Sequence, residues 1–271
     1  MGTGELKSRY GSWGLVAGAA EGLGRAFSLN LAAEKINLIL VDQQEELLES
    51  LARELEGDYR IRVRTLHLDL ESEEAVEGMM ELIREVNCRM IVYNAAFSRV
   101  QRFLQNDPAM LDRYIQVNMR TPMQLVHAFG RQYSTTGDLR KGILLMSSLA
   151  GSWGTQLLGP YGGTKAFNQI LAESLHFELK REGFDVTACI AGATATPGYL
   201  ASLPYGEAGP GSAMKPDRVA RAALGALGRR PFVVSGFWNK LVYFLMTRVL
   251  PRRGSLRIMN RAVGKRYRDK L

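Results

Sequence analysis

The sequence predicts an α/β fold in which a doubly wound parallel sheet carries helices on both faces. Strand-like apolar runs alternate with helical runs over residues 1–235, a glycine-rich turn follows the first strand, and no repeat or low-complexity linker interrupts the pattern. The chain has 271 residues, 46% of them hydrophobic, which is enough to bury one large core. We therefore expect a single domain over residues 1–235 and an extension of basic amphipathic helices over residues 236–271.

The first strand is expected at residues 12–17 and the first helix at residues 25–34, with the run GAAEGLG between them. Glycine is needed where a backbone turns tightly and approaches a pyrophosphate, and a helix N-terminus offers free N–H groups to phosphate. The turn therefore predicts a dinucleotide site. Its candidate residues are Gly18, Gly22, Leu23 and Gly24.

The second strand, residues 36–41, ends at Asp42, which lies 18 residues after Gly24. A carboxylate at this place fits a ribose diol and repels a 2′-phosphate, which favours NAD over NADP. The alternative is a loop aspartate that caps the next helix.

Further strands are expected at residues 63–68, 90–93 and 142–146, and long helices at residues 109–132 and 161–181. Each strand is followed by a helical run, so the βαβ pattern continues through the chain.

Tyr161 and Lys165 are four residues apart on the last of these helices, so they share one face. An ammonium beside a phenol favours the phenolate and lowers the tyrosine pKa from about 10. A tyrosine of this kind can act as a general acid or base near neutral pH. Ser148 precedes Tyr161 by 13 residues, at the end of a strand.

In order and spacing, these residues resemble the short-chain dehydrogenase/reductase family, in its shorter branch, over about residues 10–235. The resemblance implies a Rossmann fold. It also implies that Asp69 and Leu70 contact adenine, that Asn94 supports the sheet beside the cofactor, and that Thr194 and Thr196 belong to the turn that meets the nicotinamide. Asn118 matches the active-site asparagine.

The resemblance implies an oxidoreductase that transfers a hydride between NAD(H) and a secondary alcohol or ketone, with NADP(H) as the less favoured cofactor. Ser148 would polarise the carbonyl and Tyr161 would transfer the proton. Lys165 would lower the tyrosine pKa and bind the nicotinamide ribose, and Asn118 would anchor a link through which the proton is replenished.

Three positions depart from the family pattern: Ala17, Ala96 and Ala191 stand where a threonine, a glycine and a proline are usual. They leave a second hypothesis open, a catalytically silent NAD-binding relative that acts as a sensor or scaffold, with a membrane surface as one site of action.

Residues 197–214 lie where the family keeps its substrate lid, and their leucine, tyrosine, proline and methionine content favours a lipophilic substrate, fatty acyl or steroid-like. An acyl group on a carrier protein or coenzyme A stays an alternative. The resemblance also implies a homodimer or homotetramer, because family members are usually dimers or tetramers paired through helices such as those near 109–132 and 161–181.

Cys88 and Cys189 fall in or beside buried strands, as small core residues of a reducing compartment do. The three histidines are widely spaced, which gives no metal cluster. With neither an apolar signal core nor a membrane-length apolar run, the sequence predicts a cytoplasmic protein.

The net charge of +8 is concentrated in the C-terminal tail. Residues 229–271 hold twelve Lys or Arg and one acid, a balance of +11, so residues 1–228 sum to −3. Three interpretations of the tail stay open: a helix packed on the core or on a partner subunit, an interfacial helix on an anionic membrane, and a nucleic-acid surface. The last is disfavoured because bulky aliphatic residues interleave with the basic ones.

Overall fold

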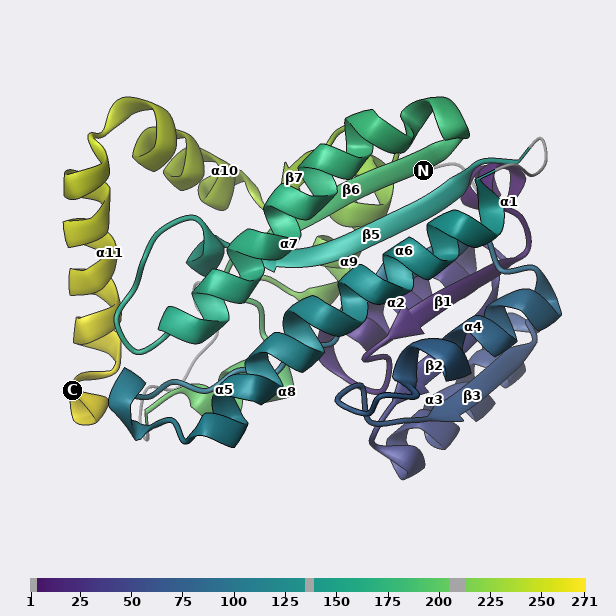
Figure 1. Cartoon of the computed structure of the whole chain (residues 1–271), viewed down its shortest axis with the longest axis horizontal. Helices are drawn as coiled ribbons and strands as arrows, with labels where there is room; N and C mark the ends of the chain where they lie inside the picture. The colour runs from purple at the N-terminus through teal and green to yellow at the C-terminus, as the bar shows by residue number, and fades with distance from the viewer. Residues whose placement is uncertain (1–3, 135–138, 205–212) are drawn as a thin grey trace.

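The computed structural model describes residues 4–134, 139–204 and 213–271. Within them, seven strands form one sheet in the order β3-β2-β1-β4-β5-β6-β7, and every neighbouring pair is parallel (Figure 1). The predicted doubly wound Rossmann sheet is confirmed. The strands are β1 Trp13–Ala17, β2 Asn37–Asp42, β3 Val63–His67, β4 Met90–Tyr93, β5 Lys141–Ser148, β6 Phe184–Ala191 and β7 Phe232–Val234.

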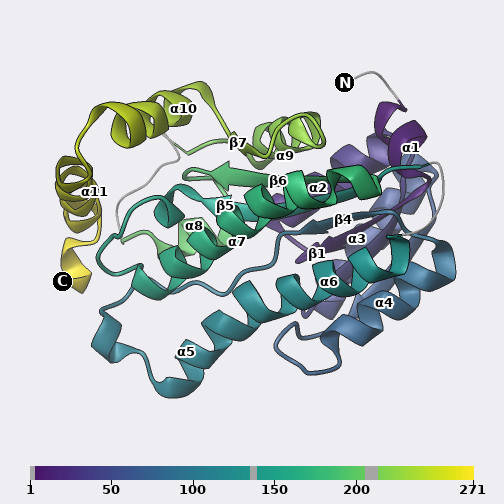
Figure 2. The ribbon, with the colours of Figure 1, turned by 45° about the horizontal axis from the view of Figure 1, so that its top comes forward.

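Helices cover both faces of this sheet (Figure 2). One apolar cluster joins the sheet to α1 Glu5–Tyr10, α2 Gly22–Ala33, α3 Glu45–Tyr59 and α9 Pro216–Ala226. A second joins the other face to α4 Ala75–Val86, α6 Thr121–Tyr133 and α7 Gly159–Glu178. Neighbours on one strand alternate between the clusters, as Val16 and Ala17 do, which explains why these strands are apolar on both faces.

The helix expected over residues 109–132 is interrupted in the structure. It consists of α5 Pro108–Ile115, a π-helical turn η2 Gln116–Arg120, and α6. Pro122 has no N–H to donate to the carbonyl four residues back, which is that of Asn118, so the regular ladder fails there. The irregular turn therefore holds one of the predicted site residues.

The C-terminal extension forms α10 Phe237–Phe244, a π-helical turn η5 Leu245–Val249, and α11 Arg252–Arg266. These elements lie at the end of the molecule toward which the strands point (Figures 1 and 2). Shorter elements complete the chain: η1 Phe103–Gln105, η3 Leu149–Gly151, η4 Leu179–Glu182, α8 Pro197–Ser202 and η6 Arg268–Lys270.

The extension contacts the core through a few specific side chains. The Tyr243 ring lies 6.0 Å from those of Trp153 and Phe232, centroid to centroid. Met246 is buried, and Ser255 donates a hydrogen bond to its carbonyl over 2.7 Å. Among the described residues, no helix is long and apolar enough to cross a membrane.

Candidate active site

Ser148 and Tyr161 come together where β5 ends and α7 begins. The Ser148 hydroxyl accepts a hydrogen bond from the Ala150 N–H over 3.2 Å and is also hydrogen-bonded to the Tyr161 side chain. The connecting segment contains Leu157, a buried residue in the left-handed region with φ 66. Strain of this kind in a bulky residue is uncommon and persists only where surrounding contacts impose it. Here the Leu157 carbonyl accepts a 3.1 Å hydrogen bond from the Gln101 N–H.

Lys165 lies one helical turn beyond Tyr161, as the spacing predicted, with its side chain directed into the sheet. It is only 3% exposed, and its Nζ donates to the Met146 carbonyl over 3.1 Å. The same Nζ lies 5.7 Å from the centroid of the Tyr161 ring. The ammonium therefore lies between the Met146 carbonyl of β5 and the Tyr161 ring. Burial lowers its pKa to about 8.

The expected lowering of the Tyr161 pKa by Lys165 is wrong for this arrangement. Burial raises the Tyr161 pKa above its ordinary value, and the hydrogen bond with Ser148 only partly opposes that rise. Desolvation disfavours both the phenolate and the ammonium, so it acts against the ion pair that the sequence suggested.

Asn118 is fully buried in the π-helical turn and bonds at three atoms. Its Oδ1 accepts from the Phe97 N–H over 2.7 Å, and its Nδ2 donates to the Phe97 carbonyl over 2.9 Å and to the Thr164 hydroxyl over 3.0 Å. Its backbone carbonyl, to which Pro122 cannot donate, accepts from Asn168 Nδ2 over 3.0 Å. Asn118 is thus joined to α7 from both its side chain and its backbone.

The neighbouring π-turn carbonyl is redirected in the same way. The Thr121 N–H bonds to Gln116, five residues back, which frees the carbonyl of Val117. That carbonyl accepts a 2.7 Å hydrogen bond from the Tyr93 hydroxyl at the end of β4. The turn is therefore fixed to the sheet as well as to α7.

The glycine turn folds tightly against the end of β4. Gly18 has φ 74, and a Cβ placed on it would lie 2.7 Å from the Ala95 Cα. Asn94 Nδ2 donates to the Gly18 carbonyl over 2.8 Å, so Asn94 joins the end of β4 to the glycine turn. A Cβ on Gly24 would lie 1.7 Å from the Gly18 oxygen. Both positions exclude any other residue.

Helix α2 starts at Gly22, three residues earlier than expected, with Leu23 and Gly24 in its first turn and no side chain capping its N–H groups. A Cβ on Gly22 would lie 3.0 Å from the Thr196 side chain, so the glycine turn and Thr196 border the same space. Free N–H groups, close-packed glycines and an adjacent threonine fit the phosphates of a dinucleotide.

Asp42 ends β2, as predicted, and is 8% exposed. One carboxylate oxygen accepts from the Ala20 N–H in the glycine turn over 3.0 Å, and the other accepts from the Gln44 N–H over 3.1 Å. The first contact ties Asp42 to the dinucleotide turn. The second is a turn contact with the residue two positions further on. Because α3 has Gln44 as its N-cap and no side-chain cap, the alternative that Asp42 caps the helix is wrong.

The remaining predicted cofactor residues lie at other strand ends. Asp69 is exposed after β3, with Oδ1 accepting from the Glu71 N–H over 2.9 Å and Oδ2 3.9 Å from Arg113 Nη2. Leu70 is buried, and its carbonyl accepts from Thr121 over 2.8 Å. Thr194 is buried after β6, and its hydroxyl donates to the Gly192 carbonyl over 2.9 Å.

Sequence reasoning missed three residues that hold this arrangement together. Thr164 accepts from Asn118 and donates to the Tyr161 carbonyl over 2.8 Å, and Asn168 bonds the Asn118 backbone. Ser147 donates to the Lys165 carbonyl over 2.8 Å. A helical signal was available for two of them, because Thr164 and Asn168 follow Tyr161 by three and seven residues on one face of α7. Among the described residues, no cluster of His, Cys, Asp or Glu could hold a metal ion.

A sequence model described as short chain dehydrogenase matches residues 13–201, which is more than half of the chain. The chain belongs to the short-chain dehydrogenase family. The predicted family is confirmed, and with it the assignment to a family of oxidoreductases that bind nicotinamide cofactors.

Among the relatives of this short-chain dehydrogenase is the 7beta-hydroxysteroid dehydrogenase of Clostridium sardiniense, 28% identical over 235 residues, or 87% of this chain and 89% of the relative. The very-long-chain 3-oxoacyl-CoA reductase of Meyerozyma guilliermondii is 29% identical over 237 residues, covering 82% and 67%. A solved 7beta-hydroxysteroid dehydrogenase structure superposes with a TM-score of 0.84 at 27% identity, covering 94% of this chain and 98% of the other.

A short-chain dehydrogenase from Sphingobium yanoikuyae, solved in complex with NADPH, has a TM-score of 0.74 at 24% identity and covers 82% of this chain and 86% of the other. At that identity the likeness is one of fold. The superpositions agree with the parallel sheet and its helix layers described above.

Proposed function

We propose that this protein interconverts a lipophilic secondary alcohol and its ketone with NAD(H). The observation that carries the proposal is the meeting of Ser148, Tyr161 and Lys165 at the carboxyl end of β5, beside a glycine turn that suits a dinucleotide. Open parallel sheets bind ligands at this end of their strands.

The dinucleotide, held over Gly18 to Gly24, would supply or accept the hydride. The Ser148 hydroxyl donates a hydrogen bond to the substrate carbonyl and orients it. In reduction, Tyr161 gives its phenolic proton to the oxygen that becomes the alcohol; in oxidation, the phenolate takes that proton back. Lys165 supplies positive charge beside the ring, and Asn118 fixes α7 against the π-helical turn.

Replacement of Tyr161 by Phe tests the proposal, because it removes the proton and keeps the ring. We expect kcat for reduction of a lipophilic ketone to fall by about 10²–10⁴-fold. NADH binding, measured by calorimetry, should be unchanged. A turnover rate equal to that of the wild type would exclude the mechanism. Absence of turnover in the wild type, with NADH still bound, would favour the silent NAD-binding relative.

For the cofactor, we propose a preference for NAD(H) over NADP(H). Asp42 bonds to Ala20, and the next residue along the turn is Glu21, so two carboxylates border the turn. Negative charge here repels a 2′-phosphate. In Asp42→Ala the affinity for NADPH should rise relative to NADH, in paired titrations of the two nucleotides. If the ratio of NADPH affinity to NADH affinity were the same in the variant and the wild type, Asp42 would have no part in cofactor selection.

The proposed lipophilic substrate is supported by the lid region and by the relatives. Helix α8 carries Leu200, which is 44% exposed, beside Thr196 and the glycine turn. The relatives named above act on a hydroxysteroid and on a very-long-chain acyl group, both largely apolar. The rest of the predicted lid, residues 205–212, lies outside the described residues.

We further propose that the extension contacts anionic lipid. Phe237 and Trp238 are 72% and 73% exposed at the start of α10, and Val249 is 59% exposed in η5. Lys240 and Arg248 lie between them. Exposed aromatic and basic residues on short helices are typical of interfacial membrane binding.

Self-association through α7 is also proposed. Its Ile170 and Phe177 are 60% and 71% exposed, which favours a covered face in a homodimer or homotetramer. The molar mass in solution, from sedimentation equilibrium, tests this. A monomer at micromolar concentration would exclude it.

A further inference from the structure

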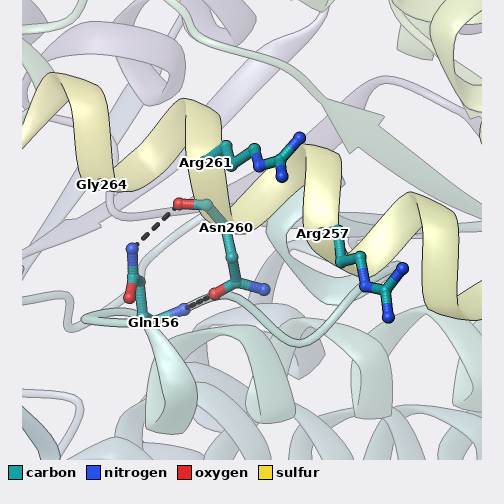
Figure 3. Close-up of a pocket in the computed structure, with 5 residues that line it drawn as sticks. All are labelled: Gln156, Arg257, Asn260, Arg261 and Gly264. Atoms are coloured by element: carbon teal, nitrogen blue, oxygen red, sulfur yellow. Dashed lines mark hydrogen bonds between the residues drawn. The ribbon is translucent and has the colours of Figure 1, made fainter.

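A groove of about 420 Å³ lies between the C-terminal helix and the loop that precedes α7 (Figure 3). Four of its five lining residues come from α11 at helical spacing, so they share one face; the fifth comes from the loop. The lining residues are Gln156, Arg257, Asn260, Arg261 and Gly264. The loop joins the strand that ends at Ser148 to the helix that carries Tyr161.

Specific hydrogen bonds fix the floor of this groove. The Gln156 N–H donates to Asn260 Oδ1 over 2.8 Å, and Gln156 Nε2 donates to the Asn260 carbonyl over 2.9 Å. Asn260 Nδ2 donates to the Gly154 carbonyl over 3.0 Å. A Cβ on Gly264 would lie 2.5 Å from Gln156 Nε2, so helix and loop approach as closely as glycine allows. The carboxamides of Gln156 on the loop and Asn260 on the helix therefore hold the floor of the groove together.

The groove carries positive charge that no ion pair among the described residues offsets. Arg257 and Arg261 are both exposed, and within the described ranges neither guanidinium forms an ion pair. Figure 3 shows both side chains extended away from the Gln156–Asn260 pair. The sequence holds one acid after residue 228, Asp269. Two arginines four residues apart can both reach one anion.

We propose that this groove is a subsite for the anionic end of an amphipathic substrate, a carboxylate or a phosphate ester joined to a lipophilic body. This deepens the proposed function and rests on it. Guanidinium groups bind carboxylate and phosphate oxygens in pairs, and a planar fork suits both. Neutral lipophilic compounds lack the group that the two arginines recognise.

The position of the groove relates it to the reaction. Gln156 precedes the strained Leu157 and lies five residues before Tyr161. A ligand held by its anion at α11 therefore lies beside the segment that joins Ser148 to Tyr161. The anion would set the register of the apolar body, so that one carbonyl along it faces the catalytic pair.

Binding of three matched probes to the full chain tests the subsite. We choose dodecanoate and dodecyl phosphate below their micelle concentrations and dodecanol below its solubility, with binding measured by calorimetry. In the double variant Arg257→Gln/Arg261→Gln, both anions should bind about tenfold more weakly, with dodecanol unchanged. The matched control is Arg252→Gln/Arg253→Gln, which removes the same charge from α11 outside the groove and should leave all three affinities unchanged.

Several outcomes would overturn the subsite. One is equal weakening in the groove and control variants, which would mean general charge attraction. Another is wild-type affinity for the anions no greater than for dodecanol. A third is loss of binding to phosphatidylglycerol vesicles in the groove variant with monomeric anions unaffected, which would assign the groove to a membrane headgroup.

The probes also distinguish the source of the anion and separate this proposal from the proposed function. Tighter binding of dodecanoate would indicate a free acid, and tighter binding of dodecyl phosphate a phosphate-bearing carrier. Because the measurement is binding, it does not depend on turnover. If the subsite proposal fails, the Tyr161→Phe kinetics and the nucleotide titrations are unaffected. If the proposed oxidoreductase activity fails, those two experiments show it and the probe binding does not.

Discussion

At the scale of single residues, Lys165 shows how burial opposes charge in this site. Its Nζ is enclosed beneath β5 with one carbonyl partner, Met146, and its pKa falls to about 8. The protein therefore keeps a lysine at a cost in stability that is full below about pH 8 and falls as pH rises toward 10.5. A group retained against such a cost is a candidate for function rather than for folding.

The cost predicts a pH-dependent effect of Lys165→Met on the free energy of unfolding. The unfolded lysine keeps its proton up to its ordinary pKa of 10.5, while the folded one loses it near 8. Between these values the unfolded state binds more protons, so wild-type stability rises with pH. The advantage of Lys165→Met should therefore shrink by about 2–3 kcal/mol between pH 7 and pH 10.

Urea unfolding at several pH values measures this difference. Lys180→Met, at an exposed position just beyond α7, is the matched control, and its difference from the wild type should stay constant with pH. A constant difference for Lys165→Met as well would mean that the buried ammonium carries no such cost.

The sequence identified the residues of this site more successfully than their electrostatics. The four-residue spacing placed Tyr161 and Lys165 on one face, because helical periodicity is a local property of the chain. The direction of the Tyr161 pKa shift depended on how deeply the phenol is buried. Enclosure arises from tertiary packing, which no spacing within the chain reveals.

At the scale of elements, the interruption between α5 and α6 is the feature that gives Asn118 its connections. Pro122 was visible in the sequence. A proline can end a helix, kink it or leave it intact, however, and local rules do not choose among these outcomes. The π-helical turn is selected by distant partners, because Tyr93 and Asn168 donate hydrogen bonds to the two redirected carbonyls, those of Val117 and Asn118.

Replacement of Asn168 by Ala removes the side-chain donor to the buried Asn118 carbonyl, which Pro122 cannot replace. We expect the free energy of unfolding to fall by about 1–3 kcal/mol. Since Asn118 joins the turn to the helix carrying Tyr161, kcat should fall as well, with KM for NADH nearly unchanged. The variant Asn168→Asp separates the effect of the side chain's size from the effect of its hydrogen bond to the Asn118 carbonyl.

The aspartate variant keeps the size of the side chain but offers no amide N–H to the Asn118 carbonyl. It should lose as much kcat as the alanine variant. If Asn168→Asp retained full activity, the hydrogen bond would be irrelevant to positioning. The readouts are urea unfolding and steady-state kinetics with NADH varied.

At the scale of the whole molecule, the C-terminal extension divides its apolar side chains between the core and the surface. Tyr243 contacts the core and Met246 is buried, whereas Phe237 and Trp238 are exposed. The sequence showed the charge asymmetry and the two helices, since both are local properties. It left core packing and membrane contact as alternatives. The docking of Tyr243 on Trp153 and Phe232 favours core packing, and lipid contact by the exposed rings stays a proposal.

Two variants separate these roles. Deletion from Phe237 onward uncovers Trp153, which is 3% exposed in the intact chain, and removes the contacts of Tyr243. Burial of one large side chain contributes about 1.5–3 kcal/mol, so deletion should lower the free energy of unfolding by at least that amount. The double variant Phe237→Ser/Trp238→Ser changes only exposed rings and should leave stability within about 0.5 kcal/mol of the wild type.

Cosedimentation with phosphatidylglycerol vesicles distinguishes the two sides of the extension. The deletion and the double variant should both lose vesicle binding, while only the deletion loses stability. In the proposed contact the exposed rings would insert between headgroups and the basic residues would attract the anionic lipid, so added salt should weaken binding of the wild type. Retained binding in the double variant would contradict the lipid-facing role, and a deletion as stable as the full chain would contradict the docking. With Arg257 and Arg261 intact in the double variant, its dodecanoate affinity should be that of the wild type, because lipid contact and the groove use different residues of the extension.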